Sequence, residues 1–338
     1  MSSPASEISK AEFLRLYSGV VADYPHLQKA PHEVRRFFKT MQLLASECPR
    51  NISVVDTGAW PGTLSVCLKR GGWNVAAIDK DSSRAPRAGT DFVAGIEDPS
   101  AAAAGVFSSI CEREGIRIEN VDLERTPLPF PTESVDVVIL AEVIEHLWSN
   151  PLFALREVNR ILKRETGRLL LSTPNLTALR NRFNFLRGQV DRIIEHPFVS
   201  FLKVERMGHL GHLRLYAPEE LRVMLSLMGF QCRFVFERIH FADSEFLVEA
   251  RDRGNRGDDN GNFNVQKHNS LTKRLLKDPV AYWNAGWATA LEFLEKVHPP
   301  FRQQVYVVGV KITDADFQQN HEESLRRLIA DNRCPERG

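Results

Sequence analysis

Short runs of β-branched and aliphatic residues alternate with helical stretches or long connections, and this alternation constrains the fold more than any other feature. When a helix connects two successive strands, the strands can pair in parallel, and the connecting helices then cover both faces of the sheet. The sequence therefore predicts an α/β fold with a mostly parallel sheet. The runs are 52–56, 74–79, 117–122, 135–140 and 167–173, followed by later strands at about 231–239 and 305–312.

Amphipathic helices precede this pattern. Residues 33–46 place apolar side chains at helical spacing, and a shorter helix is expected near 13–21. We expect them to form a helical cap over residues 1–50. The rest of the predicted organisation is a core at 51–250 with a lid insertion at 177–216, a polar mobile loop at 251–264, a helical insertion with the final core strand at 265–315, and a tail at 316–338.

Composition excludes several classes of protein. The 338 residues carry 44 basic and 43 acidic side chains, a balance that argues against a surface built wholly for nucleic acid. No apolar run approaches the roughly 18 residues of a membrane-spanning helix, and the polar N-terminus lacks a signal-peptide pattern. The five cysteines form no CxxC pair, so we expect reduced thiols rather than disulfides or a thiolate zinc site. A cytoplasmic protein without a transmembrane segment is expected.

The first strand runs into a glycine-containing turn. Asp56 ends the strand, Gly58 permits a tight turn, and Gly62 lets the backbone approach a ligand at a helix N-terminus. The second strand ends at Asp79, an acidic residue about twenty positions further on, where a carboxylate can accept hydrogen bonds from ribose hydroxyls. This combination predicts a site for a nucleoside cofactor.

These residues, together with the segment 121–147, resemble the class I S-adenosylmethionine-dependent methyltransferases. The resemblance covers about 52–240 and the strand 305–312. It implies a Rossmann-like sheet of seven strands with the last strand antiparallel, and S-adenosylmethionine as cofactor. The contacts that it implies are Gly58 and Gly62 with the methionine part, Asp79 with the ribose, Lys80 beside the adenosine, Asp122 with the adenine amine and Leu123 with the adenine ring.

Trp60 departs from the family pattern, because it stands where the middle glycine of the turn is usual. A tryptophan cannot adopt every backbone conformation that is open to glycine. Either the turn holds Trp60 outward or cofactor binding is altered. This departure motivates one alternative, a catalytically inactive nucleoside-binding or scaffold protein.

Glu142, Glu145 and His146 follow the fourth strand at spacings that place them on one face if they lie on a helix. In one hypothesis His146 is the general base that takes a proton from an attacking hydroxyl, and a glutamate orients its ring. In a second, the cluster holds a divalent metal. Glu-x-x-Glu-His is similar to the pattern of small-RNA 3′-terminal 2′-O-methyltransferases, with His209 or His212 as the fourth ligand here. The third is a structural or substrate-orienting role.

The insertion after the fifth strand is basic, and Arg180 lies among several arginines there. Arginine binds phosphate with two parallel hydrogen bonds, so an anionic acceptor would suit this lid. The insertion and the helix after it also resemble methyltransferases of polysaccharide and glycoconjugate pathways. That resemblance implies acceptor-binding roles for His212, Arg214 and Tyr216, and His209 is a further candidate.

The leading hypothesis is a methyltransferase that uses S-adenosylmethionine to methylate an oxygen of a sugar, glycoconjugate or related small molecule. A metal-assisted RNA 2′-O-methyltransferase is the alternative within enzymes, although the even charge counts against nucleic acid as a partner. The N-terminal cap and the helices at 265–300 are candidates for covering the cofactor cleft or for forming a homodimer.

Overall fold

The computed structural model describes residues 7–80, 99–147, 150–189, 212, 214–237, 298 and 302–315. Its helices are α1 (Lys10–Asp23), η1 (Pro25–Leu27), α2 (Pro31–Glu47), α3 (Thr63–Arg70), α4 (Pro99–Arg113), η3 (Ile144–His146), α5 (Pro151–Ile161), α6 (Leu179–Leu186) and α8 (Pro218–Leu227), of which η1 and η3 are single 3₁₀ turns. Its strands are β1 (Ser53–Thr57), β2 (Asn74–Asp79), β3 (Arg117–Asn120), β4 (Val137–Ala141), β5 (Arg168–Pro174), β6 (Phe230–Glu237) and β7 (Gln304–Lys311).

The strands form one sheet in the order β3-β2-β1-β4-β5-β7-β6. The pairs from β3 to β5 are parallel, whereas β7 runs antiparallel to both β5 and β6. The predicted α/β fold, with a seven-stranded Rossmann-like sheet and an antiparallel last strand, is therefore confirmed. The order reverses at β1, which pairs with β2 on one side and β4 on the other, and open α/β sheets bind ligands beyond the carboxyl ends of strands at such a point.

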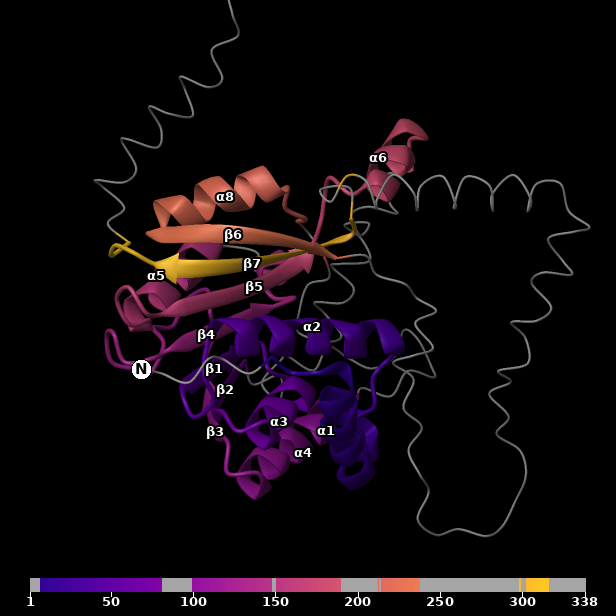
Figure 1. Ribbon diagram of the computed structural model, residues 1–338, viewed down its shortest axis with the longest axis vertical. Coiled ribbons are helices and arrows are strands. Elements are labelled where there is room, and N and C mark those ends of the chain that lie inside the picture. The colour runs from indigo at the N-terminus through magenta and orange to yellow at the C-terminus, as the bar shows by residue number, and fades with distance from the viewer. Residues whose placement is uncertain are drawn as a thin grey trace, which may run out of the picture.

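Helices cover both faces of the sheet (Figure 1). One apolar cluster joins the sheet to α1, α2, α3 and α4, and a second joins it to α5 and α8. The N-terminal helices are part of the first cluster: Phe13, Tyr17 and Met41 are fully buried there. The expected helical cap thus packs directly on the sheet and contributes to the main core.

The antiparallel strand β7 brings distant sequence to the ligand-binding edge. Gln304, its first residue, pairs with Pro174, the last residue of β5. The side chain of Gln304 therefore lies at the same edge as the carboxyl ends of the parallel strands. The predicted loop at 251–264, the helical part of the insertion up to residue 297 and the tail at 316–338 lie outside the described residues.

Candidate active site

The turn after β1 requires glycine at two positions for reasons of backbone conformation and packing. Gly58 has φ of +66° and Gly62 has φ of +101°, both in the left-handed region that side chains disfavour. A Cβ atom on Gly58 would lie 2.5 Å from a methyl of Val143, and one on Gly62 would lie 2.8 Å from the ring of Phe107. The turn can therefore lie close to the end of β4 and deliver the chain into the N-terminus of α3.

Asp56 lies beneath this turn. Its side chain is buried, and one carboxylate oxygen accepts a hydrogen bond of 2.6 Å from the hydroxyl of Ser65 on α3. Burial raises the pKa of Asp56 to about 7, although the bond from Ser65 opposes the shift. Asp56 thus ties β1 to α3, and direct contact of this carboxyl with a cofactor stays a prediction.

Trp60 points outward from the turn, with 45% of its surface exposed. Its backbone N–H donates a hydrogen bond of 2.7 Å to a carboxylate oxygen of Asp79, and the ammonium of Lys29 lies 5.9 Å from the centre of its ring. Trp60 is not among the residues with positive φ. The structure therefore accommodates a bulky residue at this position without the conformation that only glycine adopts easily.

Carboxylates stand at the ends of the next two strands. Asp79 ends β2, and Asp122 follows β3 with an ion pair of 3.0 Å to Lys80 and a hydrogen bond of 3.0 Å from the N–H of Glu124. Burial raises the pKa of Asp122, but Lys80 and the Glu124 N–H lower it by more, so the net shift is downward. Asp79 and Asp122 thus present carboxylate oxygens at the two strand ends where the resemblance implies contacts with the ribose and the adenine.

The residues after β4 do not form the helix that their spacing predicts. Glu142 has φ of +58°, the 3₁₀ turn η3 covers only Ile144–His146, and the α-helix begins at Pro151, capped by Asn150. The expectation that the two glutamates and His146 share one helical face is therefore wrong. Glu142 therefore lies outside the 3₁₀ turn that contains Glu145 and His146.

Glu142 is held from three directions. One of its carboxylate oxygens accepts hydrogen bonds from the hydroxyl of Ser172 at 2.8 Å and from the amide of Gln304, and the other forms an ion pair with Arg36. Arg36 lies on α2, in the N-terminal cap, and Gln304 begins the last strand. Glu142 is thus a fixed, charge-compensated group between three distant segments.

Glu145 lies deeper, with 1% of its surface exposed. One carboxylate oxygen accepts a hydrogen bond of 3.0 Å from Thr173, whereas the other is buried and has no hydrogen-bond partner among the described residues. Burial, with the nearby charge of Glu142 as a second cause, raises the pKa of Glu145 well above its ordinary value. This side chain therefore favours either a bound proton or a bound cation.

The structure places His212, one of the two candidates for the distant histidine, beside His146. The rings of His146 and His212 lie 4.9 Å apart, and one ligand atom from each of Glu145, His146 and His212 lies within 4.8 Å of the others. Tyr216 holds the 212–216 segment in place, because it is buried and its carbonyl accepts a hydrogen bond of 3.1 Å from the N–H of Leu176 after β5.

Two other predicted acceptor residues, Arg214 and Arg180, lie in the described part of the chain. The guanidinium of Arg214 lies 5.1 Å from the centre of the Tyr216 ring and forms an ion pair of 3.1 Å with Glu220. Arg180 is exposed on α6. His209 lies outside the described residues.

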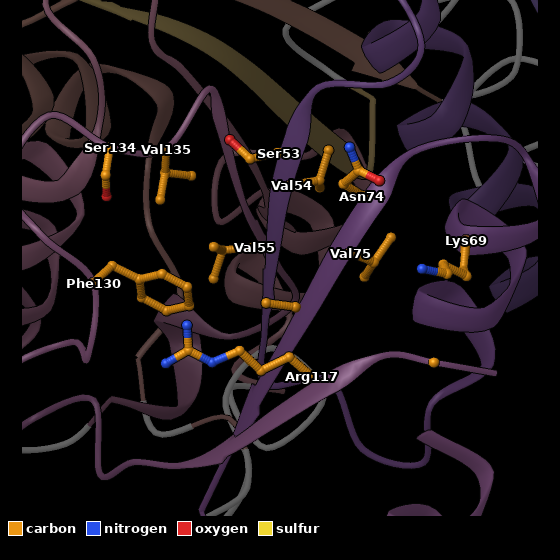
Figure 2. A pocket seen from close by; sticks show the side chains of 12 residues that line it. Ser53, Val54, Val55, Lys69, Asn74, Val75, Arg117, Phe130, Ser134 and Val135 are labelled. Carbon is orange, nitrogen blue, oxygen red and sulfur yellow. The ribbon is translucent and has the colours of Figure 1, made fainter. Parts of the chain in front are cut away.

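Figure 2 shows a pocket at the opposite edge of the sheet. The pocket is lined by Ser53, Asn74 and Arg117, the first residues of β1, β2 and β3. The guanidinium of Arg117 lies against the face of the Phe130 ring. No acidic or histidine side chain lines this pocket. All of the predicted catalytic residues lie at the carboxyl ends of the strands, so this pocket belongs to a different part of the molecule.

Comparison with protein families finds one matching model, which is described as a methyltransferase domain and covers residues 27–234. The chain belongs to this family. The match begins at the end of η1 and ends within β6, so it includes the turn after β1, the three strand ends that follow and the 212–216 segment.

Two curated relatives of this methyltransferase-domain protein come from Mycobacterium tuberculosis strains CDC 1551 and H37Rv. Both are described as a probable S-adenosylmethionine-dependent methyltransferase, and both are 48% identical to the chain over 59 residues. The matched segment is 18% of this chain and 21% of each relative, so the chain spans about a fifth of the length of the relatives it matches.

Solved structures with similar coordinates include the YcgJ protein from Bacillus subtilis, with a TM-score of 0.44 and 16% identity over 82% of this chain and 99% of that one. A SAM-dependent methyltransferase from Archaeoglobus fulgidus has a TM-score of 0.44 and 15% identity over 83% of this chain and 94% of that one.

Among the described residues, no helix combines the length and apolar character that a bilayer crossing requires.

Several residues that contact Glu142 and Glu145 were not predicted from the sequence. The contacts of Arg36 and Gln304 with Glu142 join residues 106 and 162 positions apart. Their only sequence signals were ordinary ones, an arginine on an amphipathic helix and a glutamine before a strand. The hydroxyls of Ser172 and Thr173 had a better signal, because they end the fifth predicted strand beside the fourth.

The raised pKa of Asp56 predicts a specific pH dependence of stability. The folded protein retains a proton on Asp56 between about pH 4 and the folded pKa of about 7, whereas the unfolded chain has released it. The contribution of this proton to the free energy of unfolding therefore falls as the pH rises from about 4 to about 7. Asp56→Asn has no such proton to lose, so its stability relative to wild type should increase by on the order of a few kcal/mol from about pH 5 to about pH 8. Urea unfolding at both pH values measures this, and parallel changes in the two proteins would refute it.

Proposed function

We propose that the protein transfers a methyl group from S-adenosylmethionine to an oxygen of a small polyhydroxylated acceptor, such as a sugar or glycoconjugate. The observation that carries this proposal is the order of groups along one sheet edge. Asp122, Asp79 and the Gly58 turn follow the ends of β3, β2 and β1, and the cluster around Glu145 and His146 follows the end of the adjacent β4.

The donor set suits the nucleoside end of this cofactor. Asp79 offers carboxylate oxygens, one of which accepts a hydrogen bond from the Trp60 N–H, and such oxygens are acceptors of the kind that the two ribose hydroxyls require. Asp122 is an acceptor for the adenine amine, and the half-buried Leu123 is an apolar neighbour for the ring. When bound, S-adenosylmethionine supplies a sulfonium whose methyl group is open to nucleophilic attack.

The chain's own residues would prepare the nucleophile. His146 accepts the proton of an acceptor hydroxyl, and His212 beside it is a second imidazole able to relay or hold that proton. A general base favours a hydroxyl acceptor over an amine. A hydroxyl must lose its proton as it attacks, whereas a neutral amine attacks through its lone pair and can lose its proton afterwards.

Cofactor binding gives the first test of the proposal. Asp79→Ala should weaken S-adenosylmethionine binding by about 1–3 kcal/mol through the loss of ribose hydrogen bonds. Asp79→Asn keeps an acceptor for the Trp60 N–H and separates that role from ribose binding. Isothermal titration calorimetry measures both variants, with Asp23→Ala on α1 as the control at an exposed acidic residue. Equal affinity in all four proteins would remove Asp79 from the site, and no binding by wild type would favour the nonenzymatic alternative.

Turnover gives the second test. His146→Ala should lower the rate of S-adenosylhomocysteine formation by roughly 100-fold or more, which is the usual contribution of general base catalysis, while cofactor affinity stays near that of wild type. The rate is measured over a panel of free sugars, phenols and primary amines, and His298→Ala, at an exposed histidine, is the control. Wild-type turnover in His146→Ala would exclude the base, and turnover with amines alone would exclude oxygen methylation.

A second candidate function, metal-assisted methyl transfer, is favoured by one observation. The unpartnered oxygen of Glu145 lies beside two imidazoles, and mixed carboxylate and imidazole ligands suit Mn²⁺ or Co²⁺. In this alternative His146 and His212 are ligands rather than bases. Glu142, which the sequence hypothesis also counts as a ligand, already contacts Arg36, Ser172 and Gln304, so its place in the ligand set would fall to the acceptor or to water.

Metal binding distinguishes the two candidates without any activity measurement. If the metal candidate holds, wild type should bind one Mn²⁺ or Co²⁺ per chain, and His212→Ala and His146→Ala should weaken binding by at least about tenfold, as the loss of a ligand does. Titration calorimetry with metal content after dialysis is the measurement, and His298→Ala serves as the matched control. Undiminished binding by His212→Ala, or none by wild type, excludes this site.

A further inference from the structure

The helix α6 stands off the carboxyl edge of the sheet (Figure 1). Its first half is attached to the core: Leu179 is buried, and the amide of Asn181 donates hydrogen bonds to the carbonyls of Asn175 at 2.9 Å and Leu176 at 3.2 Å. Its last two side chains are exposed, although Asn184 just before them is buried. Phe185 is 66% exposed and Leu186 is 82% exposed.

These two side chains are unusual on this molecule. They are the most exposed large apolar residues in the described part of the chain, and they are adjacent at the end of one helix. Removing apolar surface from water is favourable, so an exposed phenylalanine and leucine at a projecting tip mark a surface that gains from contact. Their cost in water is not offset by packing against another described element.

The helix α6 carries basic side chains and no acidic ones. No acidic residue occurs between Glu165 and Asp191 in the sequence, whereas Arg180, Arg182 and Arg187 are all exposed. Arg182 lies three and four residues before the apolar pair and therefore shares its helical face. Arg180 and Arg187 have no ion-pair partner among the described residues. A protein partner would need an apolar pocket ringed with acids, but an anionic lipid surface supplies acyl chains beneath negative headgroups in one layer.

We propose that the tip of α6, formed by Phe185, Leu186 and the three arginines, docks on an anionic lipid surface. The two apolar side chains enter the boundary between headgroups and acyl chains, and the guanidinium groups bind the lipid phosphates. The docked tip would hold the carboxyl edge of the sheet facing the membrane, since α6 follows β5 directly at that edge. The proposal does not depend on the reaction that the site catalyses.

Vesicle flotation tests this docking. Wild-type protein should float with vesicles of equal parts phosphatidylglycerol and phosphatidylcholine and should remain below with pure phosphatidylcholine. The double variant Phe185→Ser with Leu186→Ser should lower the partition coefficient by at least about tenfold, and Arg187→Gln by about fivefold. High salt should weaken wild-type binding, because it screens charge.

Matched controls lie elsewhere on the surface. Val106→Ser on α4 and Arg117→Gln at the opposite sheet edge remove an exposed apolar and an exposed basic side chain, and both should float like wild type. Thermal unfolding establishes that each variant is folded. No flotation of wild type, or flotation of the double variant equal to wild type, overturns the proposal. So does a wild-type dimer in sedimentation that the double variant dissolves, because a second copy would then cover the tip.

Discussion

The structure of this site depends on how the charge of two neighbouring carboxyl groups is balanced. Glu142 and Glu145 both lie at the end of β4, and burying two like charges together is strongly unfavourable. The protein treats them differently. Glu142 receives an arginine and two hydrogen-bond donors, whereas Glu145 receives one hydroxyl, and burial together with the charge of Glu142 raises the pKa of Glu145 well above its ordinary value.

This division of roles requires segments that are far apart in the sequence. Arg36 comes from the second helix, Ser172 from the fifth strand and Gln304 from the strand that inserts antiparallel at the end of the chain. The helical cap therefore does more than cover the sheet, because it carries the cation that compensates Glu142. The segment between α1 and α2 also reaches the turn after β1. The carbonyl of Leu27 accepts a hydrogen bond of 3.2 Å from the hydroxyl of Thr63, and Lys29 lies over the ring of Trp60.

Sequence patterns predicted the fold well, because the central strands β1, β4 and β5 carry apolar runs and the ends of β1 and β2 have local signatures. The turn at Gly58 and Gly62 and the acidic end of β2 could be expected for this reason, whereas a distant histidine near His146 was implied only by a family resemblance that left His209 and His212 open. The helix expected over 142–146 was wrong, because Glu142 adopts a left-handed conformation and bonds across to Ser172. Tertiary contacts override spacing there, and the partners of Glu142 cannot be read from a single chain segment, since they depend on how remote elements pack.

The two chemical hypotheses for the cluster are two solutions of one electrostatic problem. A buried carboxyl group with an unpartnered oxygen is stable if it carries a proton, and it is also stable if it shares a divalent cation with neighbouring imidazoles. In the first case, His146 would act as the proposed general base. In the second, Glu145, His146 and His212 would hold the ion, which would supply positive charge close to the acceptor oxygen. Glu142 keeps its role in both cases, because its charge is already compensated by Arg36. The compensation of Glu142 from the N-terminal cap is therefore the feature that lets the rest of the cluster accept either a proton or a metal.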